Sequence, residues 1–272
     1  IPFSTLFSMQ GKLRMALEPL IPVGKGLEDE SLADFARRRL GAEALDVLVG
    51  PLLAGIYAGD PEKMSIKSTF PQLLEMEKRG GLVKSMWLGG PKRARREGIT
   101  TFMTIKNGLS RVIDALARSL PAGAVRTDCP AQAVRRRGGR WEVVTPRGVF
   151  EADAVVAAAP APALADAIEG FDPELAIRLR EIPFVSTATT TLIYDAATFP
   201  KLPKGFGFLI PREAGSTLSA ATFSSSKFPA RSPEGKVVIR AFVGGAGREE
   251  PAEGPLTRIE EKVREELHRV LD

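Results

Sequence analysis

Histidine and cysteine, the side chains that most often act as bases, nucleophiles and metal ligands, each occur once in the 272-residue chain. Cys129 alone cannot form an internal disulfide or a cysteine-based metal cluster. His268 lies on the charged side of a predicted C-terminal helix, so we interpret it as a surface histidine. These assignments exclude a Ser-His-Asp triad, a Cys-His nucleophile and a histidine-rich zinc site. The apolar face of that helix consists of Leu256, Ile259, Val263 and Leu267.

Glycines are the other residues whose spacing needs an explanation. Residues 52–81 read LLAGIYAGDPEKMSIKSTFPQLLEMEKRGG, a segment that ends in a glycine pair. Pro71 suits the first turn of a short helix, and Gly80 can adopt the left-handed conformation that ends one. A helix stop explains one glycine of the final pair but not the second.

The composition is that of a globular protein, with 44% hydrophobic and 26% charged residues. The longest apolar stretch, residues 154–168, is interrupted by Pro160, Pro162 and Asp166, so we do not expect it to span a membrane. No export leader is recognisable, and one cysteine fits a reducing compartment, which makes the cytoplasm the expected location. The chain begins with Ile1 instead of Met, which suggests a fragment.

A formal charge of +5 raises the question of nucleic acid as a partner. Basic residues cluster in two places, at residues 91–98 and 135–140. No aromatic residues alternate with these charges, as binding of single strands would require. We therefore expect a solvated linker and a hairpin tip, and no nucleic acid partner.

Helical spacing dominates residues 1–98, where Ser31 and Asp34 resemble a capping box that opens a helix. A further helix is predicted near residues 108–120, and glycine turns predict a three-stranded meander after it. The apolar run at residues 153–160 predicts a strand buried on both faces, as in a parallel sheet.

Another helix, at about residues 162–180, precedes four segments rich in Thr and Val that predict a second sheet. The C-terminal helix would cover this sheet. The predicted fold class is therefore α+β or α/β.

Several motifs occur together in the order of a known family. They are RRLG at 38–41, PLLAGIYAGDPEKMSIKSTFPQLLEMEKRGG at 51–81, TF at 101–102, NGL at 107–109, VVAAAPA at 155–161, GFGFLIP at 205–211 and FVGG at 242–245. Through them the chain resembles the oxygen-dependent protoporphyrinogen oxidases of the flavin amine oxidase superfamily, over essentially its whole length. In such an enzyme the flavin of FAD removes the hydride, which suits a chain without catalytic His or Cys.

The resemblance implies an interleaved, flavin amine oxidase-like fold. Residues 1–98 would form a helical region that contacts the membrane and the substrate, residues 99–160 a partial FAD-binding domain, and residues 161–272 a substrate-binding domain with a mixed sheet. The G-x-G-x-x-G turn that holds the FAD pyrophosphate is missing, and GGAG at 244–247 lacks its spacing. The family's C-terminal flavin-contacting segment is missing too. We therefore expect the central part of a longer enzyme, inactive by itself.

The family binds a broad tetrapyrrole between the helical region and the sheet, where backbone must approach the ring closely. By resemblance, the substrate-binding residues are Gly81, Phe206, Gly207, Leu209 and Phe242. The backbone of Ala131 would contact the adenine of FAD. The family's basic anchor for the substrate propionates would precede Ile1. We expect no catalytic side chain and no metal site.

The activity that the resemblance implies is oxidation of protoporphyrinogen IX to protoporphyrin IX in porphyrin and haem biosynthesis, with O2 as acceptor. An alternative on the same scaffold is oxidation of coproporphyrinogen III to coproporphyrin III. A third interpretation is a non-catalytic module that binds a tetrapyrrole or a membrane surface. The resemblance is also compatible with peripheral contact with the inner face of the cell membrane, and with a homodimer.

Overall fold

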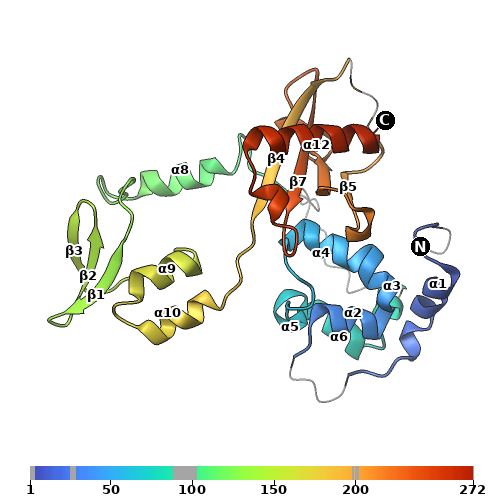
Figure 1. Cartoon of the computed structure of the whole chain (residues 1–272), viewed down its shortest axis with the longest axis horizontal. Helices are drawn as coiled ribbons and strands as arrows, with labels where there is room; N and C mark the ends of the chain where they lie inside the picture. The colour runs from blue at the N-terminus through green and yellow to red at the C-terminus, as the bar shows by residue number, and fades with distance from the viewer. Residues whose placement is uncertain (1–3, 25–28, 88–102, 198, 200–201, 272) are drawn as a thin grey trace. The chain divides into compact units, whose positions relative to one another are not determined.

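The computed structural model describes residues 4–24, 29–87, 103–197, 199 and 202–271 (Figure 1). These residues form two compact units. Unit 1 combines residues 1–106 with residues 185–272, and unit 2 consists of residues 107–184. The basic cluster at 91–98 and the TF motif at 101–102 lie outside the described residues. The expected three-part division of the chain stays a prediction.

The first part of unit 1 is a group of short helices packed around Leu32, Phe35, Leu53, Ile66 and Leu82. The capping box is confirmed, because the Ser31 hydroxyl accepts the Asp34 N–H at 3.0 Å and so satisfies a free donor at the helix start. The elements are α1 (Met9–Ala16), η1 (Glu18–Leu20), α2 (Leu32–Leu40), α3 (Ala42–Ala44), η2 (Leu45–Val49), α4 (Gly50–Tyr57), α5 (Ile66–Thr69), α6 (Pro71–Lys78) and α7 (Leu82–Trp87).

The second part of unit 1 is a four-stranded sheet with the strand order β4-β7-β6-β5. All three pairings are antiparallel, so among the described residues the sheet is not the mixed one that we expected. Short elements η3 (Arg212–Ala214), α11 (Ser224–Lys227), η4 (Pro229–Arg231) and η5 (Glu250–Ala252) connect the strands to each other and to α12. The strands and the covering helix are β4 (Thr187–Asp195), β5 (Gly207–Leu209), β6 (Leu218–Phe223), β7 (Lys236–Gly244) and α12 (Leu256–Leu271).

Helix α12 covers one face of this sheet, as its apolar repeat predicts. Ile259, Val263 and Leu267 are buried against sheet residues that include Ile239 and Ala241. Leu256, the fourth residue of the predicted face, is instead 83% exposed, because it lies in the first turn, beyond the packed part of the helix. Among the described residues, no helix is long and apolar enough to cross a bilayer.

Unit 2 contains the predicted meander, with strand order β1-β2-β3 and antiparallel pairing. Gly138 and Gly139 form the turn between β1 and β2 with φ of 56° and 85°, so the second basic cluster lies at a hairpin tip as expected. The helix predicted at about 162–180 is two helices, because Asp172 caps a new one at Pro173. The elements are α8 (Ser110–Ser119), β1 (Ala133–Arg137), β2 (Arg140–Thr145), β3 (Gly148–Ala152), α9 (Ala161–Ile168) and α10 (Pro173–Arg180).

The strand predicted at residues 153–160 is absent from the structure. This segment has no strand partner among the described residues, and all of its residues are exposed, with Val156 at 93%. Helix α8 likewise buries none of its residues, although Val112, Ile113 and Leu116 are apolar. An apolar run becomes a buried strand only where neighbouring strands supply its hydrogen bonds, and the described residues of unit 2 supply none here.

Candidate functional site

Of the predicted substrate residues of the sheet, Gly207, Leu209 and Phe242 lie on the face opposite α12. Phe206 instead pairs with Phe223, a residue of the core under α12, and so lies on the α12 side. Phe242 alternates with Ala241 and Val243, whose side chains belong to the core under α12, so Phe242 points the other way. The register pairs Phe242 with Ala220 and Ala220 with Leu209, which places all three on this second face. Gly207 lies two residues before Leu209 in the same strand and therefore lies on the same face. We call the set Gly207, Leu209, Ala220 and Phe242 the open sheet face.

Helix α4 lies against this face at a glycine. A Cβ atom built on Gly55 would be 2.7 Å from Leu209 Cδ2 and 3.7 Å from Ala220 Cβ, so only glycine allows this approach without a shift. Beyond the helix, the Ala246 N–H donates to the Ala58 carbonyl at 2.8 Å. Gly55 is not among the predicted site residues, although it lies in the GIYAG stretch that carries the family resemblance.

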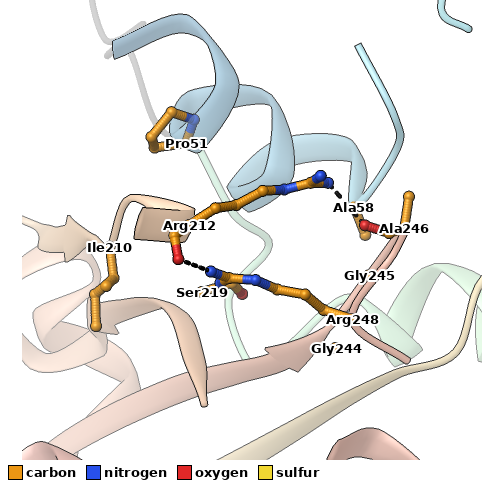
Figure 2. A pocket seen from close by; sticks show the side chains of 9 residues that line it. All are labelled: Pro51, Ala58, Ile210, Arg212, Ser219, Gly244, Gly245, Ala246 and Arg248. Carbon is orange, nitrogen blue, oxygen red and sulfur yellow. Dashed lines mark hydrogen bonds between the residues drawn. The ribbon is translucent and has the colours of Figure 1, made fainter. Parts of the chain in front are cut away.

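The cavity at this junction is small. It has a volume of about 10 Å³, which is room for one water molecule at most (Figure 2). The described residues therefore do not enclose a slot for a tetrapyrrole at the contact of α4 with the sheet. The cavity is lined by Pro51, Ala58, Ile210, Arg212, Ser219, Gly244, Gly245, Ala246 and Arg248.

Apolar side chains remain exposed on α4 and along β5. Ile56 and Tyr57 of α4 are 57% and 47% exposed. Leu209 of β5, a predicted substrate residue, is 40% exposed; Phe206, also predicted, is 52% exposed but lies on the other face of the sheet. Large apolar groups that remain in contact with water on two adjacent elements indicate a surface able to bind an apolar partner or ligand. The arrangement is an open surface instead of a closed pocket.

Gly207 has a structural reason to be glycine. Its φ is +148°, and a Cβ there would lie 2.0 Å from the Ala221 carbonyl oxygen of the neighbouring strand. Close pairing of β5 with β6 therefore requires glycine, whatever binds to the face. The predicted role of Gly207 in substrate binding stays a prediction.

The nearest neighbours of Gly81 belong to η1 and α2 and not to the open sheet face. Gly80 ends α6 with φ of +101°, as predicted, and the Gly81 N–H donates back to the Met76 carbonyl at 3.2 Å. A Cβ on Gly81 would lie 2.7 Å from Glu18 Oε2 and 3.0 Å from Arg39 Nη2. We expected the substrate ring to approach Gly81 closely; in the structure, the ion pair of Glu18 and Arg39 occupies this place.

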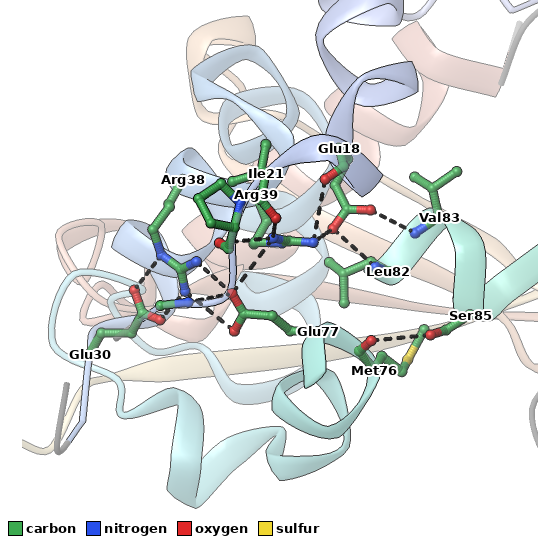
Figure 3. Close-up of polar contacts among 12 residues, drawn as sticks. Glu18, Ile21, Glu30, Arg38, Arg39, Met76, Glu77, Leu82, Val83 and Ser85 are labelled. Atoms are coloured by element: carbon green, nitrogen blue, oxygen red, sulfur yellow. Dashed lines mark hydrogen bonds and ion pairs between the residues drawn. The ribbon is translucent and has the colours of Figure 1, made fainter. Parts of the chain in front are cut away.

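This ion pair joins Glu18 of η1 to Arg39 of α2 (Figure 3). Both side chains are buried, with exposed fractions of 0% and 1%. Glu18 also accepts the N–H groups of Leu82 and Val83 at 3.0 Å each, and so caps the first turn of α7. Arg39 donates to the Ile21 carbonyl at 2.8 Å. The pair therefore fixes the start of α7 directly after Gly81.

A second, less buried layer adjoins this pair. Arg38 contacts Glu77 of α6 at 2.6 Å and also pairs with Glu30. Burial would raise the pKa of Glu77, but the hydrogen bonds from Arg38 and from the Gly24 N–H outweigh it, so the pKa lies below its usual value. Glu77 thus stays ionised and holds α6 to α2.

The sequence contains a signal for this network that we did not use. Leu32, Phe35 and Ala36 of α2 are buried, and Arg39 continues their i, i+3, i+4, i+7 stripe. A charged residue on an apolar stripe requires a buried partner. Arg39 belongs to a run of three arginines at 37–39. Such a run is typical of a solvated charge cluster, so the burial of Arg39 was not predicted.

Ala131 precedes β1 in unit 2 and is exposed. The N–H of its neighbour Gln132 donates to the Val144 carbonyl of β2 at 2.8 Å, which extends the pairing of β1 with β2 by one residue. The predicted adenine contact of Ala131 stays a prediction. The GGAG motif at 244–247 is not a phosphate-binding turn, because its Gly245 and Ala246 N–H groups already bind the Ser186 and Ala58 carbonyls.

The fold and these motifs agree with comparisons to known proteins. The chain matches the family of flavin containing amine oxidoreductases over residues 2–272 and belongs to this family. A crystal structure of an Exiguobacterium protein superposes with a TM-score of 0.82 at 30% identity, over 98% of this chain and 57% of that one. UDP-galactopyranose mutase has the same fold, with a TM-score of 0.68 at 16% identity, over 98% of this chain and 57% of its own.

Two curated relatives are porphyrinogen oxidases by name. Coproporphyrinogen III oxidase of Bacillus subtilis is 31% identical over 98% of this chain and 58% of its own length. The chloroplastic protoporphyrinogen oxidase of rice, Oryza sativa subsp. japonica, is 30% identical over 90% of this chain and 50% of its own length. The chain thus spans between half and three-fifths of the length of these relatives.

Proposed function

We propose that the complete protein containing this chain is an FAD-dependent oxidase that converts a porphyrinogen to the corresponding porphyrin, with O2 as the final acceptor. The observation that carries the proposal is the match of 98% of the chain to a porphyrinogen oxidase at 31% identity. Protoporphyrinogen IX is the first candidate substrate, and coproporphyrinogen III is the second.

The open sheet face would bind the substrate ring. Leu209 and Phe242 present apolar surface on it, with Leu209 40% exposed and Phe242 half-buried. A flat tetrapyrrole covering these side chains would exclude water from both, which favours binding and holds the ring in one orientation. The residues of this chain thus position the substrate, and when bound the flavin supplies the hydride acceptor.

The part of the cofactor that this chain can hold is limited to its adenine end. Ala131 is exposed, so its backbone is accessible to an adenine ring. The sequence contains no G-x-G-x-x-G turn, so the pyrophosphate needs residues outside this chain. The residues expected to complete the FAD-binding domain would cover the exposed segment 153–160 and α8. We propose that unit 2 belongs to that domain.

The function is tested with the complete protein, FAD and each porphyrinogen under air, with porphyrin fluorescence as the readout. We expect turnover of at least one substrate. Leu209→Ala should raise KM about tenfold, because a partly exposed leucine loses roughly 1–2 kcal/mol of apolar contact with the ring on truncation. Leu256→Ala, at an exposed apolar position on the far side of the sheet, should leave KM unchanged.

Three outcomes would contradict the proposal or a part of it. Absence of turnover with both substrates in a protein that has bound FAD would refute the oxidase function. Binding of a porphyrin by a complete protein without flavin would favour the non-catalytic module. An unchanged KM for Leu209→Ala would remove the open sheet face from the substrate site.

We also propose peripheral membrane contact through α1. Its side chains Met9 and Leu13 are 78% and 62% exposed, and Leu20 of η1 is 79% exposed, whereas Phe7 is buried. Apolar groups on one side of a short helix can enter the headgroup region of a bilayer. Met9→Glu with Leu20→Glu should abolish cosedimentation of the complete protein with phosphatidylcholine vesicles. Gln10→Glu adds charge to the same helix and should leave cosedimentation unchanged. Equal cosedimentation of all variants would refute the contact.

A further inference from the structure

Two arginines lie side by side at the edge of the open sheet face (Figure 2). Arg212 follows β5, and Arg248 follows the glycine-rich loop after β7. Arg212 Nη2 donates to the Ala246 carbonyl at 2.7 Å, and Arg248 Nη2 donates to the Arg212 carbonyl at 2.6 Å. Their side chains run past each other in opposite directions and line the same small cavity.

The positive charge of this pair is not matched by an ion pair. Within the part of the chain that the structure describes, both arginines donate to backbone carbonyls, and neither lies within ion-pair distance of a carboxylate. Burial and the charge of Arg212 lower the pKa of Arg248, an effect that the charge of Glu213 only partly offsets. A guanidinium carries five N–H donors, so these bonds leave donors for an anion.

The position of the pair connects it to the open sheet face. Arg212 lies three residues after Leu209 along the chain. Ser219 lines the same cavity as the arginines, and its hydroxyl donates to the Phe242 carbonyl at 3.1 Å. A flat ring bound over Leu209 and Phe242 would therefore direct substituents at its rim toward the guanidinium groups.

We propose that Arg212 and Arg248 bind a propionate that coproporphyrinogen III carries where protoporphyrinogen IX carries a vinyl group, and so favour a carboxylate-rich porphyrinogen of the coproporphyrinogen type. This inference rests on the proposed oxidase function. Coproporphyrinogen III carries four propionates, whereas protoporphyrinogen IX has vinyl groups in place of two of them. Guanidinium groups bind carboxylates through charge-assisted hydrogen bonds, and a vinyl group offers no acceptor. The pair thus selects between the two candidate substrates.

The test compares both porphyrinogens as substrates of the complete, FAD-loaded protein. Arg212→Gln and Arg248→Gln keep a donor for the backbone carbonyls but remove the charge. Each should raise KM for coproporphyrinogen III about tenfold, with kcat unchanged, because a charge-assisted hydrogen bond is lost away from the reacting carbon. KM for protoporphyrinogen IX should change less than twofold. Arg212→Lys, which keeps the charge, should restore part of the preference.

Arg264→Gln is the matched control, because Arg264 lies on α12 and pairs with Glu260 at 2.8 Å. It should leave both KM values unchanged. An equal rise in KM for both substrates would overturn the inference, because the arginines would then bind a propionate common to both substrates or only hold the loop. Loss of FAD in the arginine variants would overturn it as well, since the anion would then be a cofactor phosphate. If the wild-type protein oxidises neither substrate, the failure lies in the proposed function.

Discussion

Replacing Arg39 by Met should destabilise the complete protein by about 3–5 kcal/mol, because it leaves the carboxylate of Glu18 buried without its cation. Met keeps much of the volume of the arginine stem, so the effect reports charge more than packing. The measurement is the free energy of unfolding from urea titration, followed by circular dichroism. Adding Glu18→Leu to this variant should restore about 2 kcal/mol, although it also removes the carboxylate that caps the Leu82 and Val83 N–H groups.

The chain offers a control two residues away on the same helix. Arg37 pairs with Asp34 and Glu62, but its side chain is 43% exposed. Exposed ion pairs contribute about 0–1 kcal/mol, so Arg37→Met should be almost neutral. Equal midpoints for Arg37→Met and Arg39→Met would contradict the claim that burial makes the second pair critical.

Gly207→Ala should destabilise the protein by about 2–5 kcal/mol, since the new methyl group would lie 2.0 Å from the Ala221 carbonyl oxygen and the residue would keep a φ of +148°. Neither strand can move without disturbing the β5 to β6 register. Leu209 would shift with β5, so we also expect porphyrinogen turnover to fall. The measurements are the midpoint of thermal unfolding and the activity of the complete protein at a temperature where it is folded.

Gly205→Ala separates the two causes. Gly205 has a φ of +136°, but a Cβ there would have no atom within 4 Å. Only the backbone strain remains, which is about 1–2 kcal/mol. If Gly205→Ala and Gly207→Ala destabilised the protein equally, the close approach of β6 would not be the reason for glycine at position 207.

Much of the fold follows from local patterns in the sequence. The capping box at Ser31, the apolar stripe of α12 and the glycine turn of the meander are each set by residues close together in the chain. Helix and hairpin signals of this kind depend on neighbours within a few residues. The segment at 153–160 was predicted wrongly because a buried strand depends on partner strands, which its own residues cannot specify.

The candidate site was less predictable than the fold. Leu209 and Phe242 could be placed on one face only once the register of β5, β6 and β7 was known. The role of Arg39 depends on Glu18, which lies in a different helix, and nothing in the sequence pairs these two residues. The arginine pair at 212 and 248 is likewise created by tertiary structure, since a loop and a strand end meet there.

The division of unit 1 into two chain segments has a consequence for folding during translation. Residues 1–106 emerge from the ribosome well before residues 185–272, and unit 2 is made in between. The early helices can bury Phe35 and Leu53 among themselves, but the side of α4 at Gly55 must wait for β5 and β6. Until then, this apolar surface is open to chaperones or to aggregation, and translation has to reach β6 before it can be covered.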